Sequence, residues 1–214
     1  MVLKRAVCGL LFSMLSCGML LAQNAEVKVA HTVHAGPITP AKDTPPALRT
    51  IYSNLGPTAT DDYNDTTGYY VTGPTNAVNG TEQAIALPFT PKVSAHVTGL
   101  QAAIGWISGT KLVDIGLYSD NSGVVGTLLA SGHSTHLPTF GSCCQLVTIT
   151  IPSTAVTAGT QYWIVASSDD TNGPDLASVW QSSNDVNTGG NVSLGGWFTF
   201  SNNWPAGAAK GTVP

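Results

Sequence analysis

Charged residues are scarce in this 214-residue chain. Lysine, arginine, aspartate and glutamate together make up 9% of it, with 8 basic and 12 acidic residues and a formal net charge of −4. The basic residues form no cluster, and this argues against partners such as nucleic acid or an anionic membrane surface. Glutamate is nearly absent, because Glu82 is the only one beyond Glu26. Solubility must therefore rest on Thr, Ser, Asn and Gly.

Helical periodicity is also lacking. Outside the N-terminal apolar run, no long stretch places apolar residues at three- and four-residue spacing. Short runs with a period of two recur instead, separated by turn residues, which is typical of strands. Gly99 interrupts one run and predicts a bulge there, residues 120–123 predict a turn, and Pro152 is expected to end a strand. The expected strands are 93–97, 102–106, 111–118, 126–131, 146–151 and 160–167, with last edges at 179–180 and 197–200.

These patterns predict an all-β fold, a single antiparallel β-sandwich of jelly-roll type over residues 50–214. Residues 23–49 carry four prolines and no hydrophobic period, so they read as an extended linker that is not packed into the domain.

The first 22 residues have the layout of a secretory signal peptide. Lys4 and Arg5 precede an apolar run over 6–21, and Ala22 provides a small residue at the expected cleavage position. The run is short for a membrane span, so we expect an exported chain with no membrane insertion after cleavage. A lipoprotein anchored through Cys17 is the weaker alternative, because the residues that follow Cys17 are still apolar.

Cysteine usage agrees with export. Cys8 and Cys17 belong to the expected signal peptide, which leaves the adjacent pair Cys143 and Cys144. This pair could form a vicinal disulfide, could bond to other chains, or could stay reduced and buried; it cannot join distant parts of the fold.

Seven segments occur in a recognisable order, namely 51–55, 68–73, 89–91, 113–120, 126–130, 137–144 and 158–163. This order resembles a group of exported bacterial domains of unassigned function, of the kind found in PEP-CTERM and choice-of-anchor proteins. The resemblance covers most of residues 51–200. It implies a secreted β-sandwich domain and carries over no catalytic residue. The chain ends at 210–214 without a hydrophobic helix or a basic tail, so release is expected in place of anchoring.

Two acidic clusters have the composition of calcium loops, because calcium takes six to eight oxygen ligands and these often come from loops. The first holds Asp61, Asp62 and Asp65 with Asn64, and the second holds Asp169, Asp170 and Asp175 with Asn172. The alternative is that Asp and Asn simply form turns by bonding to nearby backbone groups. Calcium at Asp61, Asp62 and Asp65 is kept as a hypothesis.

The sequence offers little support for a catalytic site or a zinc site. A glycosidase needs two carboxyl groups about 5–10 Å apart, and no pair of that kind is evident; no Gly-x-Ser-x-Gly motif occurs either. His133 and His136 precede the two cysteines, but on an extended strand they would point to opposite faces. We therefore expect a protein that is not an enzyme and that has no cofactor, with bound calcium as the alternative hypothesis.

Tryptophans give the main functional hypothesis. Trp106 and Trp163 lie in apolar strands and are expected in the core, whereas Trp180, Trp197 and Trp204 lie in a polar region and are expected to be accessible. Accessible rings could stack on sugars, with Asp169, Asp170 and Asn172 as polar partners. The expected function is extracellular binding, to a glycan or a cell-surface protein. A structural envelope or matrix role is the alternative, and a glycan-active hydrolase is the third option.

Overall fold

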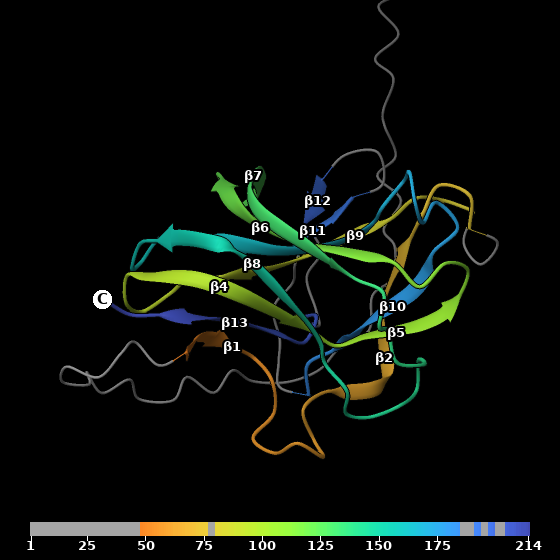
Figure 1. The fold of residues 1–214 in the computed structure, drawn as a ribbon, viewed down its shortest axis with the longest axis horizontal. Helices are drawn as coiled ribbons and strands as arrows, with labels where there is room; N and C mark the ends of the chain where they lie inside the picture. Colours follow the sequence, from red (N-terminus) through yellow and green to blue (C-terminus); the bar gives the residue numbers. More distant parts are fainter. Residues whose placement is uncertain (1–47, 77–79, 185–190, 194–196, 200–203) are drawn as a thin grey trace, which may run out of the picture.

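The computed structural model describes residues 48–76, 80–184, 191–193, 197–199 and 204–214 (Figure 1). Within these ranges every regular element is a β-strand, and all the named strands pair antiparallel. The all-β fold is thereby confirmed, and its layers are consistent with a β-sandwich. The part of the chain that is described holds no helix long and apolar enough to cross a membrane. The expected signal peptide and almost all of the expected linker lie outside these ranges.

The strands form three sheets (Figure 1). The four-stranded sheet has the order β1 (Arg49–Ser53), β13 (Gly207–Thr212), β4 (Ala95–Ala102) and β8 (Val147–Val156). The three-stranded sheet has the order β2 (Asn64–Thr72), β10 (Ala177–Ser182) and β5 (Ile104–Ser108). The six-stranded sheet has the order β12 (Trp197–Thr199), β11 (Asn191–Ser193), β3 (Ala84–Phe89), β9 (Tyr162–Ser168), β6 (Val113–Asn121) and β7 (Val124–Ser134).

One hydrophobic core joins the three sheets, and alternate residues of their strands enter it. The alternation is clear in β8, where Val147, Ile149 and Ile151 are buried and the residues between them are exposed. Because side chains alternate across a strand, each strand offers one face to this core. The largest side chains that are fully buried include Trp180, Ile85, Leu87, Leu100, Ile104, Ile115, Leu117 and Ile164.

Two turn and bulge predictions are confirmed. The pairing between β4 and β8 shifts register between Val97 and Gly99, where the glycine predicted a bulge. The β6–β7 hairpin turns at Ser122 and Gly123, both with positive φ, between the paired residues Asn121 and Val124. Two residues with positive φ give the twist that a tight hairpin needs.

The expected end of a strand at Pro152 is wrong, because β8 continues to Val156. Proline lacks an N–H and is tolerated at bulges and at sheet edges. Both conditions hold at Pro152. β8 is the edge of the four-stranded sheet, and Pro152 lies between Thr150 and Thr154, where the register against β4 shifts.

Asn54, which follows β1, forms hydrogen bonds to the segment that leads into β13. The residue is buried, its Nδ2 donates to the carbonyl oxygen of Pro205 at 2.8 Å, and its Oδ1 accepts from the Gly207 amide at 2.8 Å. Its own carbonyl accepts a hydrogen bond from the hydroxyl of Ser183. One amide side chain therefore satisfies two backbone groups that the fold hides from water.

Candidate functional site

Trp180 does not provide an accessible ring, and the expectation that it binds ligand is corrected. Its side chain is 0% exposed, and its indole Nε1 donates to the carbonyl oxygen of Ala206 at 2.8 Å. Its strand, β10, is flanked by β2 on one side and β5 on the other, so the expected edge strand is the centre of a sheet. A ring enclosed in this way supports the fold and cannot stack on a sugar.

Trp197 lies on β12 of the six-stranded sheet and is partly exposed. It packs, together with the partly exposed Tyr118 of β6, against a second apolar cluster on the face of the six-stranded sheet that points away from the main core. We call Tyr118 and Trp197 the aromatic patch. Its apolar base consists of Ala84, Ala86, Val125, Trp163 and Val165. Because small residues occupy much of this base, the two larger rings can lie against the sheet.

The two edges of the six-stranded sheet approach each other at this patch. Although β12 and β7 are at opposite ends of the strand order, they are in contact (Figure 1). The sheet is therefore strongly curved, as twisted sheets of this size become. The curvature brings Trp197 of β12 to the same apolar cluster as Val125 of β7.

Trp204, the third predicted ring, is partly buried against the main core. Its indole Nε1 is buried and has no hydrogen-bond partner in the described part of the molecule. It does not join the aromatic patch. Trp163 is buried as expected, but on the outer cluster instead of in the main core, and Trp106 is only partly buried. Tyr118 was not predicted as an accessible ring. It follows the core residue Leu117 in β6, so its side chain lies on the other face of the strand.

Asp120 holds Trp163, a residue of the apolar base of the aromatic patch, through hydrogen bonds. Its Oδ1 accepts hydrogen bonds from Trp163 Nε1 at 2.8 Å and Gln161 Nε2 at 2.7 Å, and its Oδ2 accepts from the Gly123 amide at 3.1 Å. Burial alone would raise the pKa of Asp120, but the hydrogen bonds outweigh it and lower the pKa below its usual value. The charged carboxylate thus holds the indole of Trp163 in position.

The Asp120 network predicts acid sensitivity. Because the folded-state pKa is lowered, the stabilisation is complete above the unfolded pKa of about 3.9 and is lost as pH falls through the folded value. We expect Asp120→Asn to be less stable than the parent near neutral pH, and to lose less stability on acidification. Urea unfolding between about pH 6 and pH 2 measures this. Parallel curves for the two proteins would contradict it.

Asp114 links the aromatic patch to the loop that follows β9. Burial, and secondarily the negative charges of Asp169 and Asp170, raise the pKa of Asp114, while His133 on β7 lowers it. His133 is the cross-strand partner of Asp114, and Ser167 of β9 faces it from the other side. Burial also raises the pKa of Tyr118, with a further contribution from Asp114. Polar and charged side chains around Asp114 therefore lie near the Tyr118 ring of the aromatic patch.

The loop residues predicted as sugar partners mostly bond to one another. Asp169 accepts from the amides of Thr171 and Asn172 and from the side chain of Asn172, at 2.7–3.0 Å. Asp170 accepts from the Ser168 hydroxyl at 2.7 Å. This is the turn chemistry that Asp and Asn commonly provide. The amide group of Asn172 is already engaged, whereas both carboxylates add negative charge beside Asp114.

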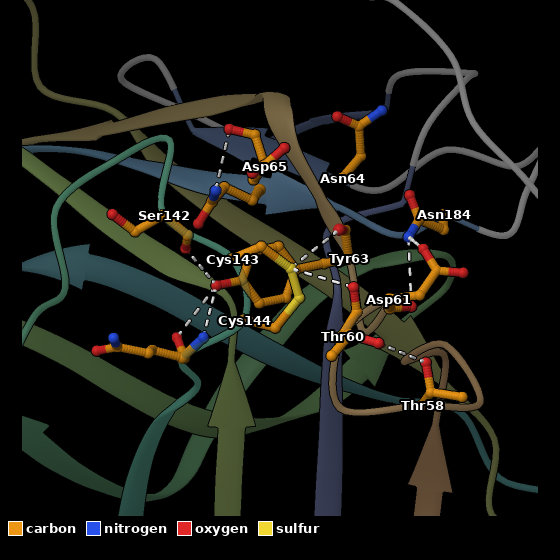
Figure 2. The surroundings of a disulfide bond; sticks show 12 residues. Thr58, Thr60, Asp61, Tyr63, Asn64, Asp65, Ser142, Cys143, Cys144 and Asn184 are labelled. Atoms are coloured by element: carbon orange, nitrogen blue, oxygen red, sulfur yellow. Dashed lines mark hydrogen bonds between the residues drawn. A yellow bond between two sulfur atoms is a disulfide. The ribbon is translucent and has the colours of Figure 1, made fainter.

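The structure does not assemble a calcium site from Asp61, Asp62 and Asp65. The carboxylate of Asp61 accepts from Asn184, and Figure 2 shows Asp61 and Asp65 on opposite sides of Tyr63. Asp65 uses its main-chain carbonyl to accept from Gln181. Among the described residues no group of three His, Cys, Asp or Glu side chains is placed to hold a metal ion. The two contacts reach distant parts of the chain, whereas Asn64 forms a local turn by accepting a hydrogen bond from the Thr66 amide at 3.0 Å.

Cys143 and Cys144 are joined by a disulfide in the loop between β7 and β8 (Figure 2). Cys144 packs against a small cluster that contains the buried Tyr63. The Tyr63 hydroxyl donates to the Ser142 carbonyl and accepts from the Gln145 amide, both at 2.8 Å. One tyrosine thereby holds both flanks of the disulfide, a role that no sequence pattern indicated.

The vicinal pairing predicts a specific chemical behaviour. A proteolytic peptide containing Cys143 and Cys144 should resist alkylation before reduction and take up two alkyl groups afterwards, because a disulfide sulfur carries no nucleophilic thiolate. Mass spectrometry of the protein, purified without reductant, measures both states. Alkylation without reduction would contradict the pairing, and so would a disulfide-linked dimer.

Comparison of the chain with protein-family models, with curated proteins and with solved structures finds no significant match.

Proposed function

We propose that this chain is an exported, non-catalytic binding module whose ligand is an extracellular glycan, held at the aromatic patch. The observation that supports it is that Tyr118 and Trp197, from strands at different places in one sheet, lie partly exposed over the same apolar cluster. Large rings held rigidly at a surface provide contact area at a low cost in conformational entropy.

The neighbouring polar groups fit this ligand class. Sugars expose C–H faces, which pack on rings, and hydroxyl groups, which need donors and acceptors. His133 and Asp114 lie side by side in the register of β7 and β6, and Gln161 and Asp120 are fixed next to Trp163. The patch thus combines a hydrophobic surface with polar groups at its border.

A glycan array tests the proposal, followed by titration of any hit with the parent protein and three variants. Trp197→Ala and Tyr118→Ala should each weaken binding on the order of tenfold, since a ring contact contributes about 1 kcal/mol or more. Tyr70→Ala is the matched control, because Tyr70 is 42% exposed but lies on β2 of another sheet. Its affinity should equal that of the parent.

Two results would contradict the proposal. A broad array without any hit would favour the structural envelope or matrix role. Equal losses in Tyr70→Ala and Trp197→Ala would show that the aromatic patch is not the binding site. Including a chelator in one series also tests calcium, which the proposal does not require.

The hydrolase alternative has one observation in its favour, the raised pKa of the half-buried Asp114 beside Asp169 and Asp170. Glycosidases use one such carboxylic acid together with a second carboxylate. Prolonged incubation with any glycan hit, with product analysis, decides between the two. Cleavage that disappears in Asp114→Asn would replace the binding module with an enzyme.

A further inference from the structure

A cleft of about 320 Å³ opens beside the disulfide loop, away from the aromatic patch. One wall is Lys111, in the connection between β5 and β6, and the other is the long connection between β7 and β8. The volume is at the lower end of the range of about 300–1,000 Å³ for small-ligand sites. The lining combines polar and apolar groups, namely Lys111, Thr135, His136 and Gln145 with Leu137 and Leu146.

Lys111 is held in place by groups that do not neutralise it. Its ammonium nitrogen lies 4.5 Å from the centre of the Trp106 ring and 3.5 Å from the carbonyl oxygen of Leu137. A lysine ammonium has three N–H donors, so a ring face and one carbonyl leave donors for another acceptor. The Trp106 ring is itself fixed by a 3.0 Å hydrogen bond from Nε1 to the Gly109 carbonyl.

The cleft walls are tied together before any ligand arrives. The Trp106 amide donates to the Pro138 carbonyl at 2.7 Å, and the Phe140 amide donates to the Trp106 carbonyl at 2.9 Å. On the far side, Tyr63 binds the Gln145 amide next to the disulfide. A cleft whose walls are already fixed saves the ordering cost that a flexible loop would impose on binding.

The lining specifies the chemistry of the ligand. The cation calls for an anionic group, because hydrogen bonds to a charged partner are about twice as strong as neutral ones. Thr135, His136 and Gln145 offer groups that bond to hydroxyls, and Leu137 and Leu146 offer an apolar wall for C–H groups. We propose that this cleft binds the carboxylate-bearing ring of an acidic saccharide, a hexuronate.

This inference goes beyond the proposed function and does not depend on it. The cleft uses no residue of the aromatic patch: its lining comes from the β5–β6 and β7–β8 connections, whereas Tyr118 and Trp197 lie on strands β6 and β12. A Trp197→Ala protein should bind the hexuronate as well as the parent does. The experiments therefore distinguish a failure of this proposal from a failure of the proposed function.

Calorimetric titration of the exported protein with galacturonate tests the proposal, with galactose, acetate and inorganic phosphate as comparison probes. The Kd for galacturonate should rise about tenfold or more in Lys111→Gln, through loss of a charge-assisted hydrogen bond. Lys92→Gln is the matched control, because Lys92 is an exposed lysine on the connection between β3 and β4. It removes the same charge and should leave the Kd unchanged.

Lys111→Arg, which keeps the charge, should retain most of the affinity, and thermal unfolding of each variant shows that it is folded. Amide NMR shifts on titration should gather at Lys111, Leu137 and Gln145. Absence of galacturonate binding, equal binding of galactose, or equal effects of the two glutamine variants would each overturn the proposal. Acetate or phosphate binding as tight as galacturonate would reduce the cleft to a general anion site and overturn the saccharide assignment.

Discussion

Replacing Trp180 with alanine is expected to lower the free energy of unfolding by about 3–5 kcal/mol. The indole is fully buried in the main core, and its removal leaves a large cavity between packed sheets. Since small domains are stable by only about 5–15 kcal/mol, the variant would keep little of its stability. Urea unfolding followed by circular dichroism gives the difference between the two proteins.

Trp180→Phe separates the cavity from the hydrogen bond. Phenylalanine keeps much of the apolar volume but cannot donate to the Ala206 carbonyl, which then retains only the hydrogen bond from the Ala103 amide. Losing one hydrogen bond costs about 0.5–1.5 kcal/mol, so the stability of this variant should lie between those of the parent and Trp180→Ala. Its folded form should bind glycans as the parent does. A loss of affinity without a loss of stability would return Trp180 to the binding site.

Replacing Asn54 with alanine is expected to cost about 2–5 kcal/mol, because the Pro205 carbonyl and the Gly207 amide both lose their partner. Both backbone groups belong to buried residues, so water cannot easily replace the Asn54 side chain as their hydrogen-bond partner. Thermal and urea unfolding measure the change. Asn54→Leu should be no better, because it fills the space but still leaves both groups unpaired.

Asn172→Ala is the matched control for Asn54→Ala. Asn172 also bonds through its side chain, to Asp169, but on an exposed loop where water can take over. The expected change is within about 0.5 kcal/mol, as for most surface substitutions. Equal effects at the two asparagines would show that burial does not decide the cost.

Strands with distinct local chemistry could be predicted from the amino-acid sequence. Alternation identified the regions of β4 to β9, and Gly99 and the Ser122–Gly123 turn marked their irregularities. β13 was not predicted, because Gly207–Thr212 has few β-branched residues and no long apolar side chain. It is a strand because β1 and β4 flank it and satisfy its backbone.

The residues of the aromatic patch were also hard to predict, because their exposure depends on contacts between distant strands. Trp180 and Trp197 have similar polar surroundings in the sequence, yet one is in the centre of a sheet and the other on an edge strand. Strand order is a non-local property, so composition could not separate them. Tyr118 was overlooked for the related reason that the outer face of β6 becomes important only once β12 curves toward β7. The turn formed by Asp169, by contrast, could be predicted, because its hydrogen bonds to the amides of Thr171 and Asn172 are local.

The position of β13 between β1 and β4 constrains how the protein is made. A nascent chain that stops before residue 207 cannot build the middle of the four-stranded sheet, and β1 then has no neighbour. Pairings so far apart in sequence form slowly and late. The four-stranded sheet should therefore close only after residues 207–212 have been synthesised, even though its first strand leaves the ribosome more than 150 residues earlier.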